Sequence, residues 1–378
     1  MQNYRINLMR NAANFKPADR VAHFANAVTW KVFDAGHNLN EAFGDFDVMA
    51  RCVEHFLEAY PVDGLIDSGI RNQFNVTRAF GEGYYYHDDE VVGIKDHAHC
   101  TPDTLMEYLD DTERYIWEKL LPAKYPDWEN KDISIWQKSF DEYIKYVFFI
   151  LRMGKLTAKY GIPSMAPNNP MKGSITFAVE ELEANLLGIK GLSLAMRRDE
   201  GLIEEFVNRW DEQYIAPVIE KVKKGKGPNY KYCFDASLMM LAHNIMNPKQ
   251  FEKFYYPYLK KLLDAYAEKK MNVRIFTEGS IMRFADYFAD IPRGVLTLHI
   301  ENDDAVAIRR ALPNVAIMGG LTGRLLSEGS PEMCVDRVKY LIDELKEGFI
   351  LSEDKMLSYR NDAKSENFKA VCEYVEGL

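Results

Sequence analysis

The chain has 378 residues, of which 47% are hydrophobic and 28% charged, the balance of a folded globular protein. Its 47 Lys and Arg residues stand against 57 Asp and Glu residues, which gives a net charge of −10. This charge argues against wrapping nucleic acid, against lying on an anionic membrane and against a substrate with many negative charges. No apolar run approaches the roughly 20 residues of a membrane span. Five scattered cysteines and an N-terminus without a signal peptide's apolar core predict a reduced, cytoplasmic protein.

Short β-like runs alternate with amphipathic helices along the chain. A helix is predicted over 47–60, and residues 100–190 are mostly helical. Asn247-Pro248 and Ser330-Pro331 each place a capping residue before a first-turn proline, which predicts two further helix starts. Eight strands are predicted, at 21–24, 64–67, 162–166, 231–234, 273–276, 295–299, 315–318 and 348–351.

Eight strands alternating with helices are typical of a parallel (β/α)₈ barrel, an α/β fold of the TIM type. An open doubly wound sheet is the weaker alternative, because no GxGxxG follows the first strand. Chemistry in a barrel lies at the carboxyl ends of the strands. The side chains predicted at those ends are Asp67, Asp235, Glu278, His299 and the Gly319-Gly320 pair.

Four segments of the second half carry a resemblance to a known superfamily. They are Phe276-Thr277-Glu278-Gly279-Ser280, Leu298-His299, Met318-Gly319-Gly320-Leu321 and the run from Leu325 to Glu332. Together they resemble the uroporphyrinogen decarboxylase-like superfamily, which comprises decarboxylases and zinc- and corrinoid-dependent methyltransferases. The resemblance implies one TIM-type barrel domain over 1–378, with an N-terminal helical extension over about 1–20 and a helical insertion over about 100–160.

The sequence departs from both of the better-known branches. The decarboxylases share arginines that flank an Ala-Gly pair after the first strand, whereas Ala35-Gly36 is flanked here by Phe33 and His37. A porphyrinogen with many carboxylates needs cations, since burying unpaired charge costs several kcal/mol. The thiol methyltransferases carry a His-x-Cys pair where this chain has Phe276 and Glu278. Tetrapyrrole decarboxylation is therefore the alternative rather than the leading hypothesis.

Glu278 and His299, with twenty residues between them, resemble part of the zinc motif of ether-demethylating methyltransferases of anaerobes. We therefore predict a zinc ion on Glu278 and His299, with Asp235 as the best third ligand because it ends the preceding strand. Zinc with carboxylate and imidazole ligands is a strong Lewis acid toward oxygen and would stabilise the leaving oxygen of a methyl ether. These three residues are predicted to be catalytic.

Each of these residues also has a purely structural interpretation. Glu278 could pair with Arg274 or Arg283, His299 could be a core histidine bonded to the backbone, and Asp235 could cap a helix. The substrate pocket is predicted to be mostly apolar at its mouth. We expect Trp30 and Phe276 to line it, with His37 and Gly320 as further substrate-binding residues.

The sequence therefore predicts a methyltransferase that moves a methyl group between a small methoxylated compound, such as an aromatic ether, and a corrinoid protein. The corrinoid would be carried by a separate protein that docks over the carboxyl ends of the strands, and neither nucleic acid nor a membrane is an expected partner. A cofactor-free decarboxylase and a non-catalytic barrel that binds a corrinoid are the alternatives. Zinc bound by the purified protein would favour the methyltransferase.

Overall fold

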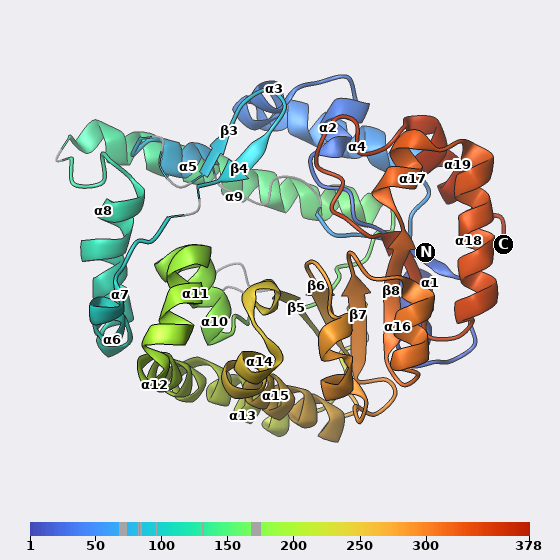
Figure 1. Ribbon diagram of the computed structural model, residues 1–378. Coiled ribbons are helices and arrows are strands. Elements are labelled where there is room, and N and C mark those ends of the chain that lie inside the picture. The colour runs from blue at the N-terminus through green and yellow to red at the C-terminus, as the bar shows by residue number, and fades with distance from the viewer. Residues whose placement is uncertain (68–73, 82, 84, 96, 131, 168–174) are drawn as a thin grey trace.

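A curled, seven-stranded parallel sheet forms the centre of the fold in the computed structural model, which describes all residues except 68–73, 82, 84, 96, 131 and 168–174 (Figure 1). The strand order is β2-β1-β9-β8-β7-β6-β5, and every neighbouring pair is parallel. This confirms the predicted α/β class and TIM-type fold. The strands are β1 (Ala22–Ala25), β2 (Gly64–Leu65), β5 (Ala236–Met240), β6 (Val273–Thr277), β7 (Leu296–Ile300), β8 (Ala316–Leu321) and β9 (Phe349–Glu353).

Two of the eight predicted strands differ from the structure. Among the described residues, neither 162–166 nor 231–234 forms a strand. These two segments nevertheless lie side by side, because the Cys233 and Phe234 amides donate to the Ser164 and Met165 carbonyl oxygens at 3.2 and 2.8 Å. The strand expected at 231–234 begins instead at Ala236, which moves its carboxyl end to Met240. This shift decides the place of one predicted site residue.

The first helices close one end of the sheet and cover one side of it. Residues Ile6, Leu8 and Met9 of α1 pack in one buried cluster with residues of β1, β8 and β9, so α1 closes the amino-terminal end of the barrel. The predicted helix over 47–60 is confirmed as α4. The helices of this region are α1 (Gln2–Ala13), α2 (Trp30–Asp34), α3 (Leu39–Gly44), α4 (Phe46–Ala59) and α5 (Phe74–Arg78), and the hairpin strands are β3 (Tyr85–His87) and β4 (Val92–Ile94).

Residues 102–224 are almost entirely helical in their described parts. The longest helix, α9, runs behind α5 and the β3–β4 hairpin in Figure 1. Three stretches are π-helical. The elements are η1 (Pro102–Thr104), α6 (Leu105–Asp110), α7 (Thr112–Tyr115), η2 (Ile116–Leu120), α8 (Leu121–Lys124), α9 (Ile133–Lys159), α10 (Ala178–Glu181), η3 (Leu182–Leu187), α11 (Gly188–Arg198), α12 (Glu200–Trp210), η4 (Asp211–Ile215) and α13 (Ala216–Lys224).

The second half alternates strand and helix, and both helix starts predicted there are confirmed. Asn247 and Gln250 form a capping box, and the Ser330 hydroxyl accepts from the Met333 amide. Helices α16, α18 and α19 cover the outside of the sheet (Figure 1). The elements are η5 (Ala242–Ile245), α14 (Pro248–Phe254), α15 (Tyr256–Glu268), η6 (Met282–Phe288), α16 (Ala305–Ala311), α17 (Gly323–Glu328), α18 (Pro331–Leu345) and α19 (Ser365–Glu376).

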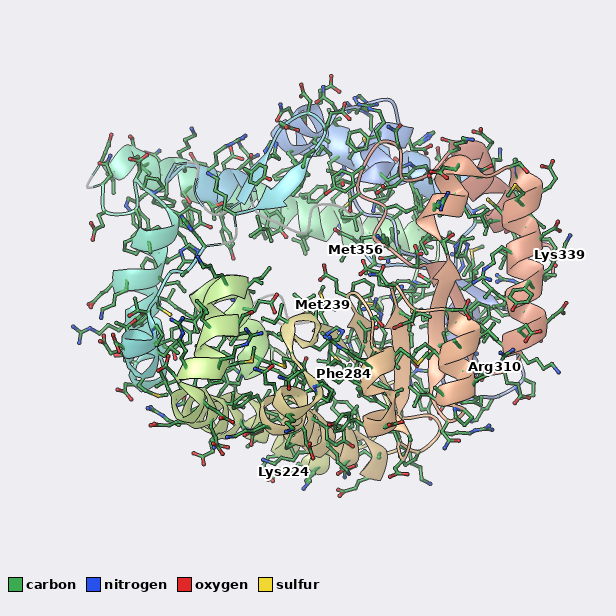
Figure 2. All side chains as sticks on the ribbon, in the orientation of Figure 1. Lys224, Met239, Phe284, Arg310, Lys339 and Met356 are labelled. Carbon is green, nitrogen blue, oxygen red and sulfur yellow. The ribbon has the colours of Figure 1, made fainter. Side chains whose placement is uncertain are left out.

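Among the helices in the described part of the chain, none combines the length and the apolar character that crossing a membrane demands. The carboxyl ends of β6, β7 and β9 point toward the side of the molecule that carries α9 and the β3–β4 hairpin (Figure 1). Figure 2 places Met239 of β5 and Met356 of the β9–α19 loop in the middle of the molecule, whereas Lys224, Arg310 and Lys339 lie on the outer helices.

Candidate functional site at the carboxyl ends of β5, β6 and β7

A buried carboxyl group, Glu180, lies at the carboxyl end of β5. Its oxygens accept hydrogen bonds from the amides of Leu241 and Ala242, each at 3.1 Å, in the turn between β5 and η5. The Tyr255 hydroxyl donates to the same carboxyl at 2.7 Å. Glu180 comes from α10, which is followed at once by the π-helix η3, an irregularity often found at functional sites.

The pKa of Glu180 is raised from 4.5 to about 7, and burial is the largest cause. The charge of Glu278 raises the pKa further, while the hydrogen bonds from Tyr255 and the two backbone amides oppose the shift. Burial and the neighbouring carboxyl also raise the pKa of the Tyr255 hydroxyl well above 10. Glu180 therefore exchanges its proton near neutral pH, which is the property of a general acid or base.

Glu278 follows β6 and is half-buried at the same edge. Its backbone amide donates to the Met240 carbonyl oxygen at 3.0 Å. Its backbone carbonyl oxygen accepts from the side-chain amide of Asn244 at 2.7 Å. Gly279 makes this contact with Asn244 possible, because its φ is +76° and a Cβ there would lie 2.2 Å from the Asn244 Oδ1. The backbone that carries Glu278 is thus fixed against the β5–η5 turn that binds Glu180.

His243 in η5 is fully buried at this edge. Neither of its ring nitrogens has a hydrogen-bond partner among the described residues, and its ring packs edge-on against Phe284 at 6.1 Å. Burial and the nearby Arg283 lower its pKa to about 4, so the imidazole is neutral. Buried polar groups are normally paired, so a water molecule or a ligand has to satisfy this ring.

His299 lies inside the barrel, below the edge that carries Glu278. It is opposite Phe276 in the β6–β7 register, and the two rings are 4.9 Å apart. The Arg274 guanidinium donates to its Nδ1, while its Nε2 lies 3.2 Å from the Ser352 hydroxyl and 3.3 Å from the Glu353 carbonyl oxygen. Since a guanidinium only donates, the ring proton lies on Nε2.

Zinc does not fit the residues predicted to bind it. Both nitrogens of His299 are engaged, and the positive charge of Arg274 beside the ring would repel a metal cation. Burial and Arg274 also lower the pKa of His299 well below 6.5, so the ring is neutral. Within the described ranges, no cluster of three or more His, Cys, Asp and Glu side chains could hold a metal ion.

The expectation that Asp235 ends a strand beside Glu278 is wrong. The strand begins after it, at Ala236, so Asp235 lies at the opposite, amino-terminal edge of the sheet. There its carboxylate is buried and pairs with Arg10 of α1 at 3.0 Å, and it accepts from the amides of Asn229 and Asn272. Asp235 joins α1 to the sheet and is too distant along β5 to share a site with Glu278.

Trp30 also lies elsewhere than predicted. Its side chain is buried in the outer helical layer, where it packs in one aromatic cluster with Phe56, Tyr60 and Phe368 of α19. Its indole N–H donates to the Ala363 carbonyl oxygen at 3.0 Å. The prediction that Trp30 lines the substrate pocket is therefore wrong. Phe276, in contrast, points into the barrel, and its role in binding stays a prediction.

His37 and Gly320 are given structural roles by their surroundings. The His37 imidazole is one-third exposed and contacts Glu41 at 2.9 Å, the residue that completes the capping box of α3. Gly320 has φ +89°, and a Cβ there would press against Leu341 and Ala305 of the outer helices. Close packing against the helical layer explains this glycine, and substrate binding by His37 and Gly320 stays a prediction.

Sequence reasoning missed Glu180 and Tyr255. Glu180 stands in an acidic helical stretch, Glu180-Glu181-Leu182-Glu183, that offers no pattern to distinguish it from a solvated face. The one sequence feature that could have indicated a buried Glu180 is its position directly after the apolar residues Phe177 and Val179, which are both buried. Its three partners lie in the β5–η5 turn, in η5 and between α14 and α15, more than sixty residues away, so only the folded chain brings them together.

Two comparisons with known proteins extend these observations. Residues 188–378 match the family model described as uroporphyrinogen decarboxylase (URO-D). The solved structure of a methyltransferase from Methanosarcina mazei is similar, with a TM-score of 0.59 and 14% sequence identity over 99% of this chain and 98% of that chain. At this identity the likeness establishes the fold. Among curated protein sequences, none matches this chain.

Proposed function

The chain belongs to the uroporphyrinogen decarboxylase family, and we propose that it is a methyltransferase with this fold. It moves a methyl group between a small methoxylated compound, such as an aromatic ether, and a corrinoid carried by a separate protein. Three observations support the proposal. They are the likeness to a methyltransferase over nearly the whole length of both chains, the absence of the decarboxylase arginines, and the proton-exchanging carboxyl group at the barrel's carboxyl edge.

The region of the missing arginines disfavours a substrate with many carboxylates. Phe33 is buried, and His37 contacts Glu41. Arg360 places its guanidinium 4.7 Å from the Phe33 ring, but it is already paired with Glu90 at 2.7 Å. A tetrapyrrole would have to compete with this ion pair. Decarboxylation is therefore the second candidate function, and an assay of carbon dioxide release from uroporphyrinogen distinguishes it from methyl transfer.

The observation that carries the proposal is the Glu180 carboxyl group, with its pKa raised to about 7 beside Glu278. A methoxy oxygen that loses its methyl group becomes an alkoxide or phenolate and requires a proton. A buried acid that is partly protonated at neutral pH supplies that proton without a metal ion. The Tyr255 hydroxyl and the Leu241 and Ala242 amides then hold the ionised carboxylate in place.

A corrinoid presented by its docked protein would supply the nucleophile that accepts the methyl carbon. The electron pair of the bond between the methyl carbon and oxygen stays on the oxygen, which then requires one proton. Glu180, beside Glu278, delivers this proton and regains one from water. We assign the proton to Glu180 and not to a zinc-bound group, because Arg274 donates to the Nδ1 of His299, one of the predicted zinc ligands.

Apolar side chains on the inner face of the barrel suit an aromatic substrate. Met239 of β5 is half-buried and lies opposite Phe276 in the β5–β6 register, and Phe276 lies opposite His299. Met239 and Phe276 are therefore neighbours on one face, one step below Glu278 along β6. An aromatic ring against these two side chains would present its methoxy oxygen to the carboxyl groups at the edge.

The test uses the full chain, free cobalamin reduced to the cobalt(I) state and 2-methoxyphenol. We expect formation of methylcobalamin, followed by its visible spectrum, together with an equal amount of catechol. Glu180→Gln should lower the rate by about 100-fold or more, since general acids contribute roughly 10²–10⁴. Glu181→Gln is the matched control, because this adjacent carboxyl of α10 accepts from Tyr108 and Asn185 instead.

Two results would overturn the proposal. One is an equal rate in the wild type and in Glu180→Gln. The other is the absence of methyl transfer from methoxyphenols combined with release of carbon dioxide from uroporphyrinogen, which would establish the second candidate.

A further inference from the structure

Solvent reaches the inside of the barrel along β5. Burial alternates along this strand, so that Ser237 and Met239 are half-buried while the residues on either side of each are buried. The inward side chains of the neighbouring strands are closed off, with at most 2% of each exposed. They are Arg274 and Phe276 of β6, His299 of β7 and Ser352 of β9. A ligand inside the barrel would therefore lie against β5.

The seam between β2 and β5, the two edge strands of the sheet, has an apolar lining. Met165 belongs to the segment that lies beside the chain just before β5, and Ile66 follows β2. Both side chains are half-buried and pack on the buried cluster that α1 closes. Together with Met239 they offer an apolar surface that suits an aromatic ring.

Ser237 is a polar group within this seam. Its hydroxyl oxygen accepts from the Arg274 guanidinium at 3.1 Å, and its own proton is donated to the Met165 sulfur at 3.8 Å. A thioether sulfur is a weak acceptor, whereas a guanidinium is always charged and polarises the hydroxyl that it donates to. Ser237 is therefore a hydrogen-bond donor that an oxygen atom of a ligand would satisfy better than Met165 does.

Ser237 and the Glu180 carboxyl group lie at opposite ends of β5. Glu180 accepts from the amide of Leu241, four residues after Ser237, and four residues of a strand span about 13 Å. Two hydrogen bonds of about 2.8 Å each leave about 7 Å between the two substrate atoms that they bind. Oxygen atoms of substituents at opposite positions of a benzene ring are separated by a length of this order, whereas those on adjacent carbons are too close together.

We propose that Ser237 binds an oxygen acceptor of the substrate that lies para to the methoxy group, with the aromatic ring in the seam between β2 and β5. This inference rests on the methyl transfer proposed above and specifies its substrate class. The acceptor is a carboxylate or a phenol oxygen, and either one meets a donor that the charge of Arg274 supports. A compound such as 2-methoxyphenol, with its oxygens on adjacent carbons, reaches only one end of the site at a time.

The test measures binding to the full chain by calorimetry, without cobalamin. The ligands are 4-methoxybenzoate, 4-methoxyphenol and 4-methoxytoluene, which has no para oxygen. We expect the wild type to bind at least one of the first two about 10-fold or more tightly than 4-methoxytoluene, because a hydrogen bond supported by a charge is at stake. Ser237→Ala should lose this preference, and Ser237→Thr, which keeps the hydroxyl, should retain it.

Ser352→Ala is the matched control. Its hydroxyl also faces the inside of the barrel, but it is fully buried and contacts His299. This variant should keep the wild-type preference. Tighter binding of 4-methoxybenzoate than of 4-methoxyphenol would assign a carboxylate to Ser237, and the reverse order would assign a phenol.

Binding and methyl transfer are separate readouts, so the two proposals can fail separately. Equal affinities for all three ligands would overturn the role of Ser237, even if 2-methoxyphenol is demethylated. The same conclusion would follow from a preference that survives in Ser237→Ala, and 2-methoxyphenol binding as tightly as both para compounds would overturn the para placement. A preference that depends on Ser237, without methyl transfer from any of these ethers, would support the binding site and overturn the proposed reaction.

Discussion

Replacing Glu180 by Gln should change how the stability of this protein depends on pH. The folded-state pKa of Glu180 is about 7, against 4.5 for an ordinary glutamate. Between these two values the folded chain binds a proton more tightly than the unfolded chain does. The contribution of Glu180 to stability is therefore fully present below about pH 4.5 and is lost as the pH rises through about 7. Glutamine does not titrate, so the variant should lack this part of the pH dependence.

The expected magnitude follows from the size of the shift. Each pKa unit corresponds to about 1.4 kcal/mol, so the full shift of Glu180 from 4.5 to about 7 represents roughly 3 kcal/mol. Part of the titration lies below pH 5. Between about pH 5 and about pH 8, the wild type should lose about 2–3 kcal/mol of unfolding free energy relative to Glu180→Gln.

Urea unfolding of both proteins at the two pH values measures this difference. The comparison of the two proteins cancels the contributions of the other titrating groups, which both of them share. Glu181→Gln provides the control. The Glu181 carboxyl accepts from Tyr108, whereas the amides of the β5–η5 turn donate to Glu180. A constant difference between wild type and Glu180→Gln at both pH values would refute a raised pKa for Glu180.

Two further predictions concern the backbone and the buried ion pair. Gly279→Ala should destabilise the fold by about 1–3 kcal/mol, because its φ of +76° is strained for alanine and the new Cβ meets Asn244. Gly36→Ala, at φ +80° with open space around it, should cost only about 1 kcal/mol in the same urea titration. Arg10→Ala should cost about 3–5 kcal/mol, since it leaves the Asp235 carboxylate buried without its cation. An unchanged urea midpoint in Arg10→Ala would contradict the structural role assigned to Asp235.

The sequence predicted the fold well because periodicity reports which face of an element is buried. Six of the eight predicted strands and the starts of α14 and α18 are present, and each depended on local patterns or on a capping residue. The strand expected at 231–234 was misplaced because a short apolar run predicts a buried segment but not its conformation. Cys233 and Phe234 are buried in the cluster with α1 without forming a strand. That error of a few residues moved Asp235 to the wrong edge of the sheet.

The site was harder to predict because its chemistry depends on neighbours that are distant in the chain. The spacing of Glu278 and His299 correctly placed them on adjacent strands. It could not reveal that Arg274, two residues before Phe276, turns toward the His299 ring and donates to its Nδ1. Trp30 was misplaced for a similar reason, since aromatic residues near a strand end can pack outward as easily as inward.

The most direct measurement for the proposed function is the rate of methyl transfer from 2-methoxyphenol to cobalt(I) cobalamin as a function of pH. Glu180 donates its proton only in the protonated form, so the wild-type rate should fall as the pH rises through about 7. Glu180→Gln should be slow, with a rate that does not change over the same range, and Glu181→Gln should follow the wild type. A wild-type rate that is constant or rises through this range, or the same decline in Glu180→Gln, would contradict a proton held by Glu180.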